Sequence, residues 1–256
     1  MSSPQPATPP KTGGHGDHWG CILRQVEEKQ LLEIIKSAIS HDRSPERVGK
    51  ELSVYNWGTP SLRVKALMKG SDLVSAYPEC QGGPIWPIVV REVVTWANGY
   101  EGQVAGECYG AEMRFFDTRF YRYGATYRVG ETYNFHMGAL AYVLGRAPEA
   151  EVEIEPGVLV SLRGARAYMP ADLDNTGADI DEFWFHSPLE EPAGTISLEG
   201  HNLRVYKVTL ALPDHNELTV PLYAAEHSLS GDMQQQQVQP DDDLEGYLWL
   251  QGYRSE

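Results

Sequence analysis

The sequence predicts a mainly β protein: an antiparallel β-barrel or sandwich, of which an OB-like barrel is one form, with an N-terminal helical pair. Most of the chain consists of short runs in which β-branched or aromatic residues alternate with polar ones. Glycine- and proline-containing stretches separate these runs, and helical spacing is confined to the first quarter. Such short, turn-punctuated strands are typical of antiparallel sandwiches and barrels.

Composition divides the chain into three segments. Residues 1–20 are rich in proline and glycine and lack an apolar cluster, so they are predicted to be a disordered tail. Residues 21–70 are expected to be helical, and residues 71–256 to form the antiparallel β domain. A glutamine- and aspartate-rich stretch near residues 230–243 predicts a flexible loop within that domain.

The N-terminal helical pair rests on apolar spacing and on a capping signal. Between residues 22 and 40 apolar side chains recur every three or four positions, with charged residues on the opposite face. Ser44 then offers an N-cap, Pro45 suits the first helical position and Glu46 suits the first turn. These signals predict a second, short helix that ends near Tyr55.

The β pattern begins with a hairpin. Two β-branched runs flank Asn98-Gly99, the strongest short signal for a hairpin turn. A strand is expected from Arg114 to Thr118, followed by a turn or a single helical turn, and then a long strand over residues 132–144. Gly138 inside that long strand predicts a bend or a bulge.

The last third continues with strands that differ in character. Glu151 to Glu155 alternates acidic and apolar residues, which predicts a half-solvated strand. The carboxyl terminus, around Leu248 and Leu250, is apolar and is expected to dock into the sheet.

The net charge of −15 is concentrated in the same third of the chain. Residues 149–256 hold five Lys/Arg and twenty-one Asp/Glu, whereas residues 1–70 hold ten and seven. A field of that sign repels nucleic acid and attracts basic groups. We therefore expect the partner to be another protein, with a basic surface as its complement, and we expect nucleic acid to be disfavoured.

The composition also predicts a cytoplasmic protein. No apolar run approaches the roughly 18 residues of a membrane helix, so no membrane partner is expected. The N-terminal residues lack the apolar stretch of a secretory signal. Cys21, Cys80 and Cys108 are widely spaced and form no C-x-x-C motif, which is typical of reduced thiols.

One stretch, residues 114–128, contrasts with the acidic chain because it holds six aromatics, four arginines and a single acidic residue, Asp117. The aromatics could form core with arginines paired at the rim. The same residue types are enriched at protein interfaces, and they also stack on bases of single-stranded nucleic acid. The candidate binding residues are Arg114, Phe116, Arg119, Tyr121, Arg122, Tyr123 and Arg128.

A second candidate is the acidic segment D-L-D-N-T-G-A-D-I-D-E, which begins like a calcium-binding EF-hand loop. The resemblance fails at the twelfth position, where Phe183 stands in place of a bidentate glutamate, so a solvated turn is the favoured interpretation and no cofactor is expected. If a metal binds, calcium is the expected ion. Its candidate ligands are Asp172, Asp174, Asp179, Asp181 and Glu182.

The histidines are scattered singly and form no catalytic motif. A hydrolytic site would require the fold to bring at least two of them together with a carboxylate. The candidates are His136, His186, His201, His215 and His227.

The sequence therefore favours a non-enzymatic, acidic binding module, such as an adaptor, an inhibitor or an immunity-type partner, that uses an aromatic and arginine surface. A His-dependent or metal-assisted hydrolase is the first alternative. Single-stranded nucleic-acid binding by an OB-like barrel is the second.

Overall fold

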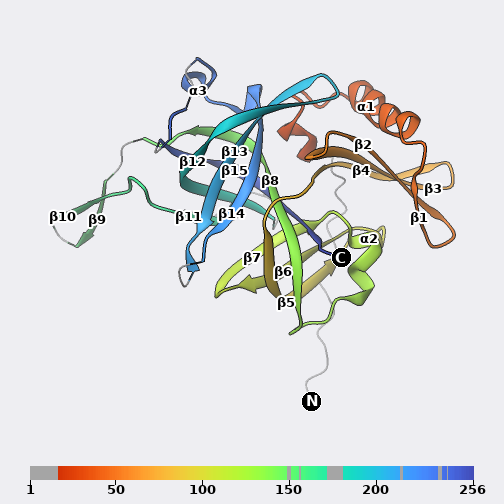
Figure 1. Ribbon diagram of the computed structural model, residues 1–256, viewed down its shortest axis with the longest axis horizontal. Helices are drawn as coiled ribbons and strands as arrows, with labels where there is room; N and C mark the ends of the chain where they lie inside the picture. Colours follow the sequence, from red (N-terminus) through yellow and green to blue (C-terminus); the bar gives the residue numbers. More distant parts are fainter. Residues whose placement is uncertain are drawn as a thin grey trace.

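The computed structural model describes residues 17–148, 151–155, 157–171, 181–213, 216–235, 238–240 and 242–256. It is mainly β, as predicted, with few and short helices (Figure 1). No helix among the described residues is both long and apolar enough to cross a membrane. Cytoplasmic location remains a prediction.

The N-terminal segment joins the fold earlier than predicted. The 3-10 helix η1 (Asp17–Cys21) replaces the end of the expected tail. Its Trp19 side chain is 1% exposed and donates a hydrogen bond from Nε1 to the Ala76 carbonyl oxygen at 3.1 Å. The first predicted helix is present as α1 (Glu28–His41), with Ile34 on its buried face.

The second predicted helix is wrong, because the segment forms strands. After α1 come β1 (Glu46–Val48), β2 (Leu52–Gly58), β3 (Leu62–Lys69) and β4 (Asp72–Cys80), which pair in this order as an antiparallel sheet. Asp42 fixes the turn instead of a helix cap, because its carboxylate accepts hydrogen bonds from the N–H groups of Ser44 at 3.0 Å and Asn56 at 2.8 Å. Gly49, with φ of +63°, makes the β1–β2 turn. The segment 21–70 is therefore one helix followed by strands.

The remaining strands form one large sheet and a small hairpin that projects from it (Figure 1). The hairpin consists of β9 (Glu151–Glu155), where a strand is predicted, and β10 (Val158–Ser161). The strands of the large sheet are β5 (Ile85–Thr95), β6 (Gly102–Cys108), β7 (Ala111–Asp117), β8 (Thr132–Arg146), β11 (Ala167–Pro170), β12 (Glu182–Leu198), β13 (His201–Ala211), β14 (Leu218–Ala225) and β15 (Asp243–Arg254).

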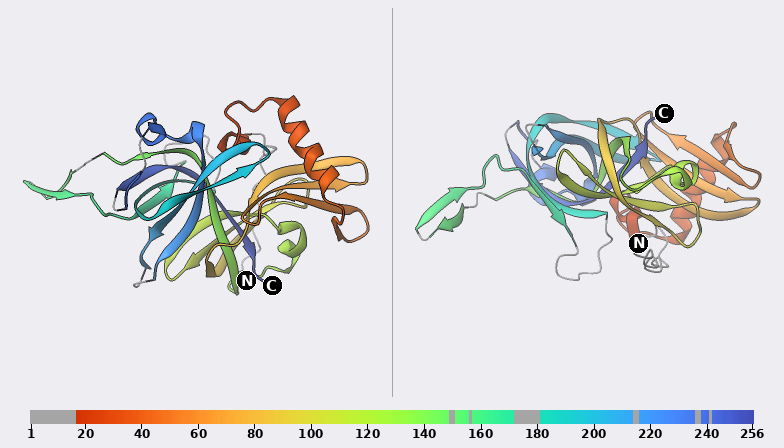
Figure 2. Two further views of the ribbon diagram at one scale, coloured as in Figure 1. Left: turned by 45° about the horizontal axis from the view of Figure 1, so that its top comes forward. Right: turned by 90° about the horizontal axis from the view of Figure 1, so that it is seen from below.

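The pairings of the described strands form two closed rings. The first ring follows β5, β6, β7, β15 and β8 back to β5. The second follows β12, β13, β14, β8 and β15 back to β12. Both rings share the long antiparallel pair β8–β15 at the centre of the molecule (Figure 2). Two pairings, β7–β15 and β14–β8, are parallel, whereas the other pairings of the described strands are antiparallel, as predicted for most of the sheet. The choice among a barrel, a sandwich and an OB-like barrel remains a prediction.

The two rings repeat one arrangement of elements, which the sequence analysis does not predict. In the first half, three strands lead into the short helix α2 (Phe120–Tyr123), the 3-10 turn η2 (Gly124–Thr126) and the long strand β8. In the second half, three strands lead into η4 (Glu226–Ser228), α3 (Gly231–Gln235) and the long strand β15. The predicted flexible loop near 230–243 contains α3, whose Met233 is fully buried.

Two apolar cores hold this architecture together. One lies within the rings and includes Phe115, Phe135 and Leu250. The other joins α1 and the β1–β4 sheet to the rings, with Trp19 and Trp249 among its members. The apolar carboxyl-terminal strand is therefore docked as predicted.

Two local predictions have clear outcomes. The expected turn at Asn98-Gly99 lies between β5 and β6, which pair as a hairpin. Gly138 marks a close approach rather than a bulge, since its register with β15 is regular and an added Cβ would lie 2.6 Å from the Cβ of Cys80.

Candidate functional site

The predicted stretch 114–128 runs along β7, α2 and η2, and the fold divides its side chains among three environments. Phe116 belongs to the core between the rings and the β1–β4 sheet. Its ring is fully buried and contacts the Tyr77 ring edge-on, with centroids 4.9 Å apart. Phe116 is therefore a packing residue and is not available to a ligand.

Arg119 and Tyr121 face a buried polar cluster around Lys65 and Glu79, which join the β1–β4 sheet to the rings. The Lys65 Nζ donates to Glu79 Oε1 at 2.8 Å and to the Tyr121 hydroxyl at 3.2 Å. Arg119 Nε lies 3.4 Å from the same Glu79 oxygen, which also accepts a 2.8 Å hydrogen bond from Thr118 Oγ1. Sequence reasoning placed Arg119 and Tyr121 on the surface, whereas these contacts turn both toward the interior.

Burial controls the electrostatics of this cluster. Desolvation lowers the pKa of the Lys65 ammonium, and the Glu79 carboxylate acts against that shift. Desolvation also raises the pKa of the Tyr121 hydroxyl, and the charge of Glu79 adds to the rise. Lys65 on β3 and Glu79 on β4 pair within one sheet, and their further contacts with Thr118, Arg119 and Tyr121 reach the segment that follows β7.

Asp117 is a second buried charge in the same stretch. Its Oδ2 accepts a hydrogen bond from the Tyr127 hydroxyl at 2.6 Å, and its Oδ1 accepts one from the Arg119 N–H at 2.9 Å. Desolvation raises the pKa of this carboxyl group to about 6 in spite of these hydrogen bonds.

The other members of the stretch, with Tyr133 and Arg254, lie at the surface and form the Arg–Tyr surface, which we define as Arg122, Tyr123, Arg128, Tyr133 and Arg254. Arg122 and Arg128 are exposed, and the other three are half-buried. The Arg254 guanidinium lies 4.6 Å from the Tyr133 ring centroid and 5.3 Å from that of Tyr123. Arg122 lies 5.5 Å from the Tyr123 ring. The N–H of Arg128 donates to the Tyr133 hydroxyl at 3.2 Å. Guanidinium and phenol groups thus alternate across this surface.

Tyr133 and Arg254 are the members that sequence reasoning missed. They come from β8 and β15, and only the strand pairing brings them beside α2. Among the described residues, Arg128 and Arg254 have no carboxylate within ion-pair distance, whereas Arg122 is paired with Glu256 at 2.6 Å.

Arg114 lies apart from this surface, on the exposed face of β7. Its Nη1 is 3.6 Å from Glu92, and the nearby Arg91 pairs with Glu107 at 3.0 Å. Glutamates match the arginines there, so this face does not offer the uncompensated positive charge that single-stranded nucleic acid needs.

The predicted calcium ligands fall mostly outside the described residues. Asp172, Asp174 and Asp179 lie there. Asp181 is fully buried and accepts a 3.0 Å hydrogen bond from Trp249 Nε1, and Glu182 lies 3.7 Å from the ring of the buried His18. In the described part of the chain, no three His, Cys, Asp or Glu side chains are grouped so that they could hold a metal ion.

The five candidate histidines separate into different places. His136 stacks on Tyr253 with ring centroids 4.9 Å apart, and His186 lies 3.6 Å from Asp243. His215 lies outside the described residues. His201 and His227, however, line one pocket. The hydrolase alternative requires two histidines and a carboxylate in one place, and these two residues meet the first part of that requirement.

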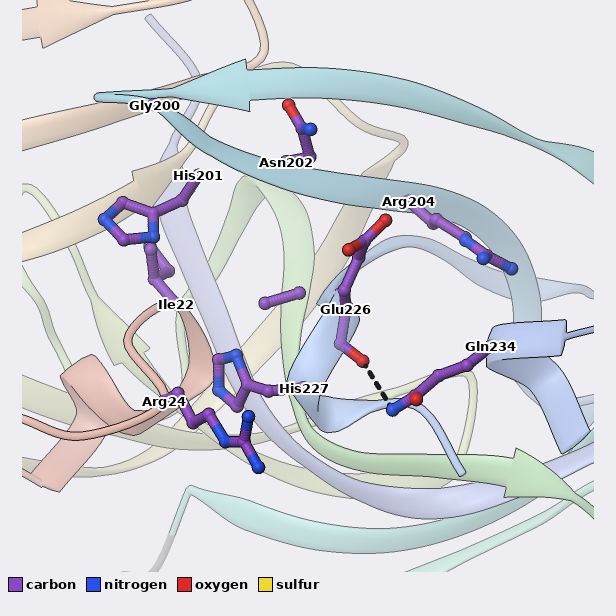
Figure 3. Close-up of a pocket in the computed structure, with 10 residues that line it drawn as sticks. Ile22, Arg24, Gly200, His201, Asn202, Arg204, Glu226, His227 and Gln234 are labelled. Atoms are coloured by element: carbon purple, nitrogen blue, oxygen red, sulfur yellow. Dashed lines mark hydrogen bonds between the residues drawn. The ribbon is translucent and has the colours of Figure 1, made fainter. Parts of the chain in front are cut away.

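That pocket, with a volume of about 530 Å³, lies between the N-terminal segment and the second ring (Figure 3). A carboxylate, Glu226, is present in its wall. The pocket is lined by Ile22, Arg24, Gly200, His201, Asn202, Arg204, Ala225, Glu226, His227 and Gln234.

Backbone contacts hold several of these side chains. The His227 Nε2 donates to the Gly20 carbonyl at 2.8 Å, and Arg204 Nη1 donates to the Met233 carbonyl at 2.7 Å. Desolvation lowers the pKa of His201, and the neighbouring His227 adds to the decrease. His201 therefore favours the neutral imidazole.

Comparison with protein-family models, with curated proteins and with solved structures gives no match for this chain. The function is therefore argued from the geometry of the Arg–Tyr surface and of the pocket.

Proposed function

We propose that the chain is a non-enzymatic binding module that engages another protein through the Arg–Tyr surface. The observation that carries this proposal is the contact of the Arg254 guanidinium with the Tyr123 and Tyr133 rings, all three half-buried at the surface of the fold. Stacking orders the arginine before a partner arrives, so less side-chain entropy is lost on binding. Arginine and tyrosine are also the residue types enriched among interface hot spots.

The charge distribution suggests the chemistry of the partner. Arg128 and Arg254 have no carboxylate partner within the described residues, so acidic groups of another protein would fit the Arg–Tyr surface. The chain as a whole carries a net charge of −15, which favours basic groups on the same partner beyond that contact. An adaptor, an inhibitor or an immunity-type protein would work in this way.

The test is affinity purification of the tagged chain from its own cells, followed by binding measurements with each purified partner. The double substitution Arg128→Ala and Arg254→Ala should weaken a direct partner about 30-fold or more, since a hot-spot loss is roughly 2 kcal/mol or larger. Arg91→Ala is the matched control, because Arg91 is an exposed, ion-paired arginine on another face. Partners that bind the double variant as tightly as the native chain would refute the proposal.

We also propose that each ring is an OB-like barrel. Five strands close each circuit, and a short helix follows the third strand of each half. An OB-fold is a five-stranded, partly open barrel, which this order supports. Oligonucleotide binding does not follow from this architecture, because fold does not determine function.

A His-dependent hydrolase is the second candidate, supported by the meeting of His201, His227 and Glu226 in one pocket. The lowered pKa of His201 favours the neutral form that a general base needs. A panel of ester and phosphoester substrates tests it: turnover that His201→Gln abolishes would support hydrolysis. Turnover that persists in this variant would refute the role of His201.

A further inference from the structure

The pocket between the N-terminal segment and the second ring gathers positive charge in a chain that is otherwise acidic. Arg24 follows η1, Arg204 lies on β13, and His201 and His227 come from β13 and η4. Glu226 is the single acidic side chain in the pocket wall. Three separate segments therefore supply four basic side chains to one concave site.

Much of the hydrogen-bonding capacity of these groups is unused. Within the part of the chain that the structure describes, the side chains of Arg24 and Asn202 make no hydrogen bond. Arg204 commits one donor to the Met233 carbonyl, which fixes the guanidinium and leaves further N–H groups available. The His227 ring is fixed through Nε2, so its Nδ1 remains for another contact.

The arrangement in the pocket places these groups around a common space. Figure 3 shows Arg24 and His227 on one side and Arg204 on the other, with Glu226 between them. No carboxylate among the described residues lies within ion-pair distance of Arg24 or Arg204. Neither guanidinium is therefore ion-paired within the described part of the fold.

We propose that this pocket binds a small organic oxyanion, with Arg24 and Arg204 as the groups that recognise its phosphate or carboxylate oxygens. Guanidinium groups bind such oxygens with paired, charge-assisted hydrogen bonds. The inference does not rest on the Arg–Tyr surface, and it requires no turnover of the ligand.

The size of the pocket limits the ligand. A volume of about 530 Å³ lies within the roughly 300–1,000 Å³ range of small-molecule sites. Asn202 and Gln234 offer amide groups that could orient the remainder of the molecule, and Ile22 supplies one apolar contact. The Glu226 carboxylate repels a second negative charge beside it, so we expect the part of the ligand next to Glu226 to carry no negative charge.

Isothermal titration calorimetry of the full chain with phenyl phosphate and with benzoate, which each carry one anionic group on an organic ring, tests the proposal and separates the two oxyanion sources. Arg24→Gln and Arg204→Gln, each made singly, should weaken binding about tenfold or more, as expected for loss of a charged hydrogen bond. Arg24 is exposed and makes no side-chain hydrogen bond to the described residues, so its substitution should leave the melting temperature unchanged.

Arg91→Gln is the matched control, because this exposed arginine is already ion-paired with Glu107 on another face and should leave anion binding unchanged. Arg128→Gln is a separate variant that reports anion binding at the Arg–Tyr surface. Binding of either probe, weakened by both pocket variants and not by the control, supports the proposal. Absence of binding by both probes at millimolar concentration, or binding that only Arg128→Gln weakens, would overturn it. Weakening by Arg128→Gln alone would place the anion at the Arg–Tyr surface. The anion-site proposal can therefore fail while the protein-partner proposal stands.

Discussion

Replacing Lys65 with methionine tests whether the buried cluster joins the β1–β4 sheet to the rings. The side chains of Lys65 and Glu79 are 2% and 1% exposed, and their ion pair is 2.8 Å long. Methionine has a similar length and keeps the packing, but it leaves the Glu79 carboxylate without its closest positive charge. Removing one partner of a buried pair costs roughly 3–5 kcal/mol.

The structure favours the lower end of that range. Arg119 Nε lies 3.4 Å from Glu79 and Thr118 Oγ1 lies 2.8 Å from it, so the carboxylate keeps two donors. We expect Lys65→Met to lower the free energy of unfolding by about 3 kcal/mol. In a chain of this size that corresponds to a decrease in melting temperature of about 6–12 °C. Urea denaturation followed by circular dichroism measures the first quantity, and differential scanning calorimetry the second.

The control lies on the same strand. Lys69 pairs with Glu51 at 2.9 Å, but both side chains are at least half exposed. Lys69→Met should therefore cost much less stability than Lys65→Met. Adding Glu79→Gln to Lys65→Met removes the uncompensated charge and should recover part of the lost stability. If Lys65→Met costs no more than Lys69→Met, the buried cluster around Glu79 contributes no more to stability than an exposed ion pair does.

Three further predictions concern other parts of the fold. Folding raises the pKa of Asp117 from 3.8 to about 6, so this group stabilises the folded state below about pH 4, and the stabilisation is lost as the pH rises through 6. Asp117→Asn should remove this pH dependence, worth about 3 kcal/mol, in unfolding curves from pH 4 to 7. Trp19→Ala should cost about 3–5 kcal/mol in urea denaturation, whereas a truly disordered tail would tolerate it. Gly83→Ala should lower the melting temperature far more than Gly82→Ala. Both glycines have positive φ, but only at Gly83 would the new Cβ clash, at 2.1 Å from the Met137 carbonyl oxygen.

Local sequence signals predicted local structure well. The Asn98-Gly99 turn, the alternation at residues 151–155 and the apolar spacing of α1 all depend on neighbours within a few residues. The long strand predicted over 132–144 is β8, Thr132–Arg146.

The second helix failed because a tertiary contact outweighed a capping signal. Ser44 and Pro45 satisfy the rules for a helix start, but the carboxylate of Asp42 bonds the N–H of Asn56, fourteen residues away. Leu52 and Val54, on alternate positions of β2, are buried against α1 and the sheet. Their period of two was the signal for a strand.

The candidate site was predictable only in part, for the same reason. The sequence identified Arg122, Tyr123 and Arg128 as unusual in composition, and they are on the surface. It could not show that Arg119 turns inward to Glu79, nor that Arg254 joins from the carboxyl terminus, because both depend on pairings across the fold. The meeting of His201 with His227 likewise requires the register of β13 with β14.

The shared strands β8 and β15 make the two halves mutually dependent. Each half supplies four strands of its own ring, and the fifth strand, which is the parallel partner of its third strand, comes from the other half. A chain cut between the halves, in the connection that carries the β9–β10 hairpin, would give two fragments that each expose unpaired edges. We expect neither fragment to fold by itself, and we expect the two to reassemble when they are produced together, each completing the other by strand exchange.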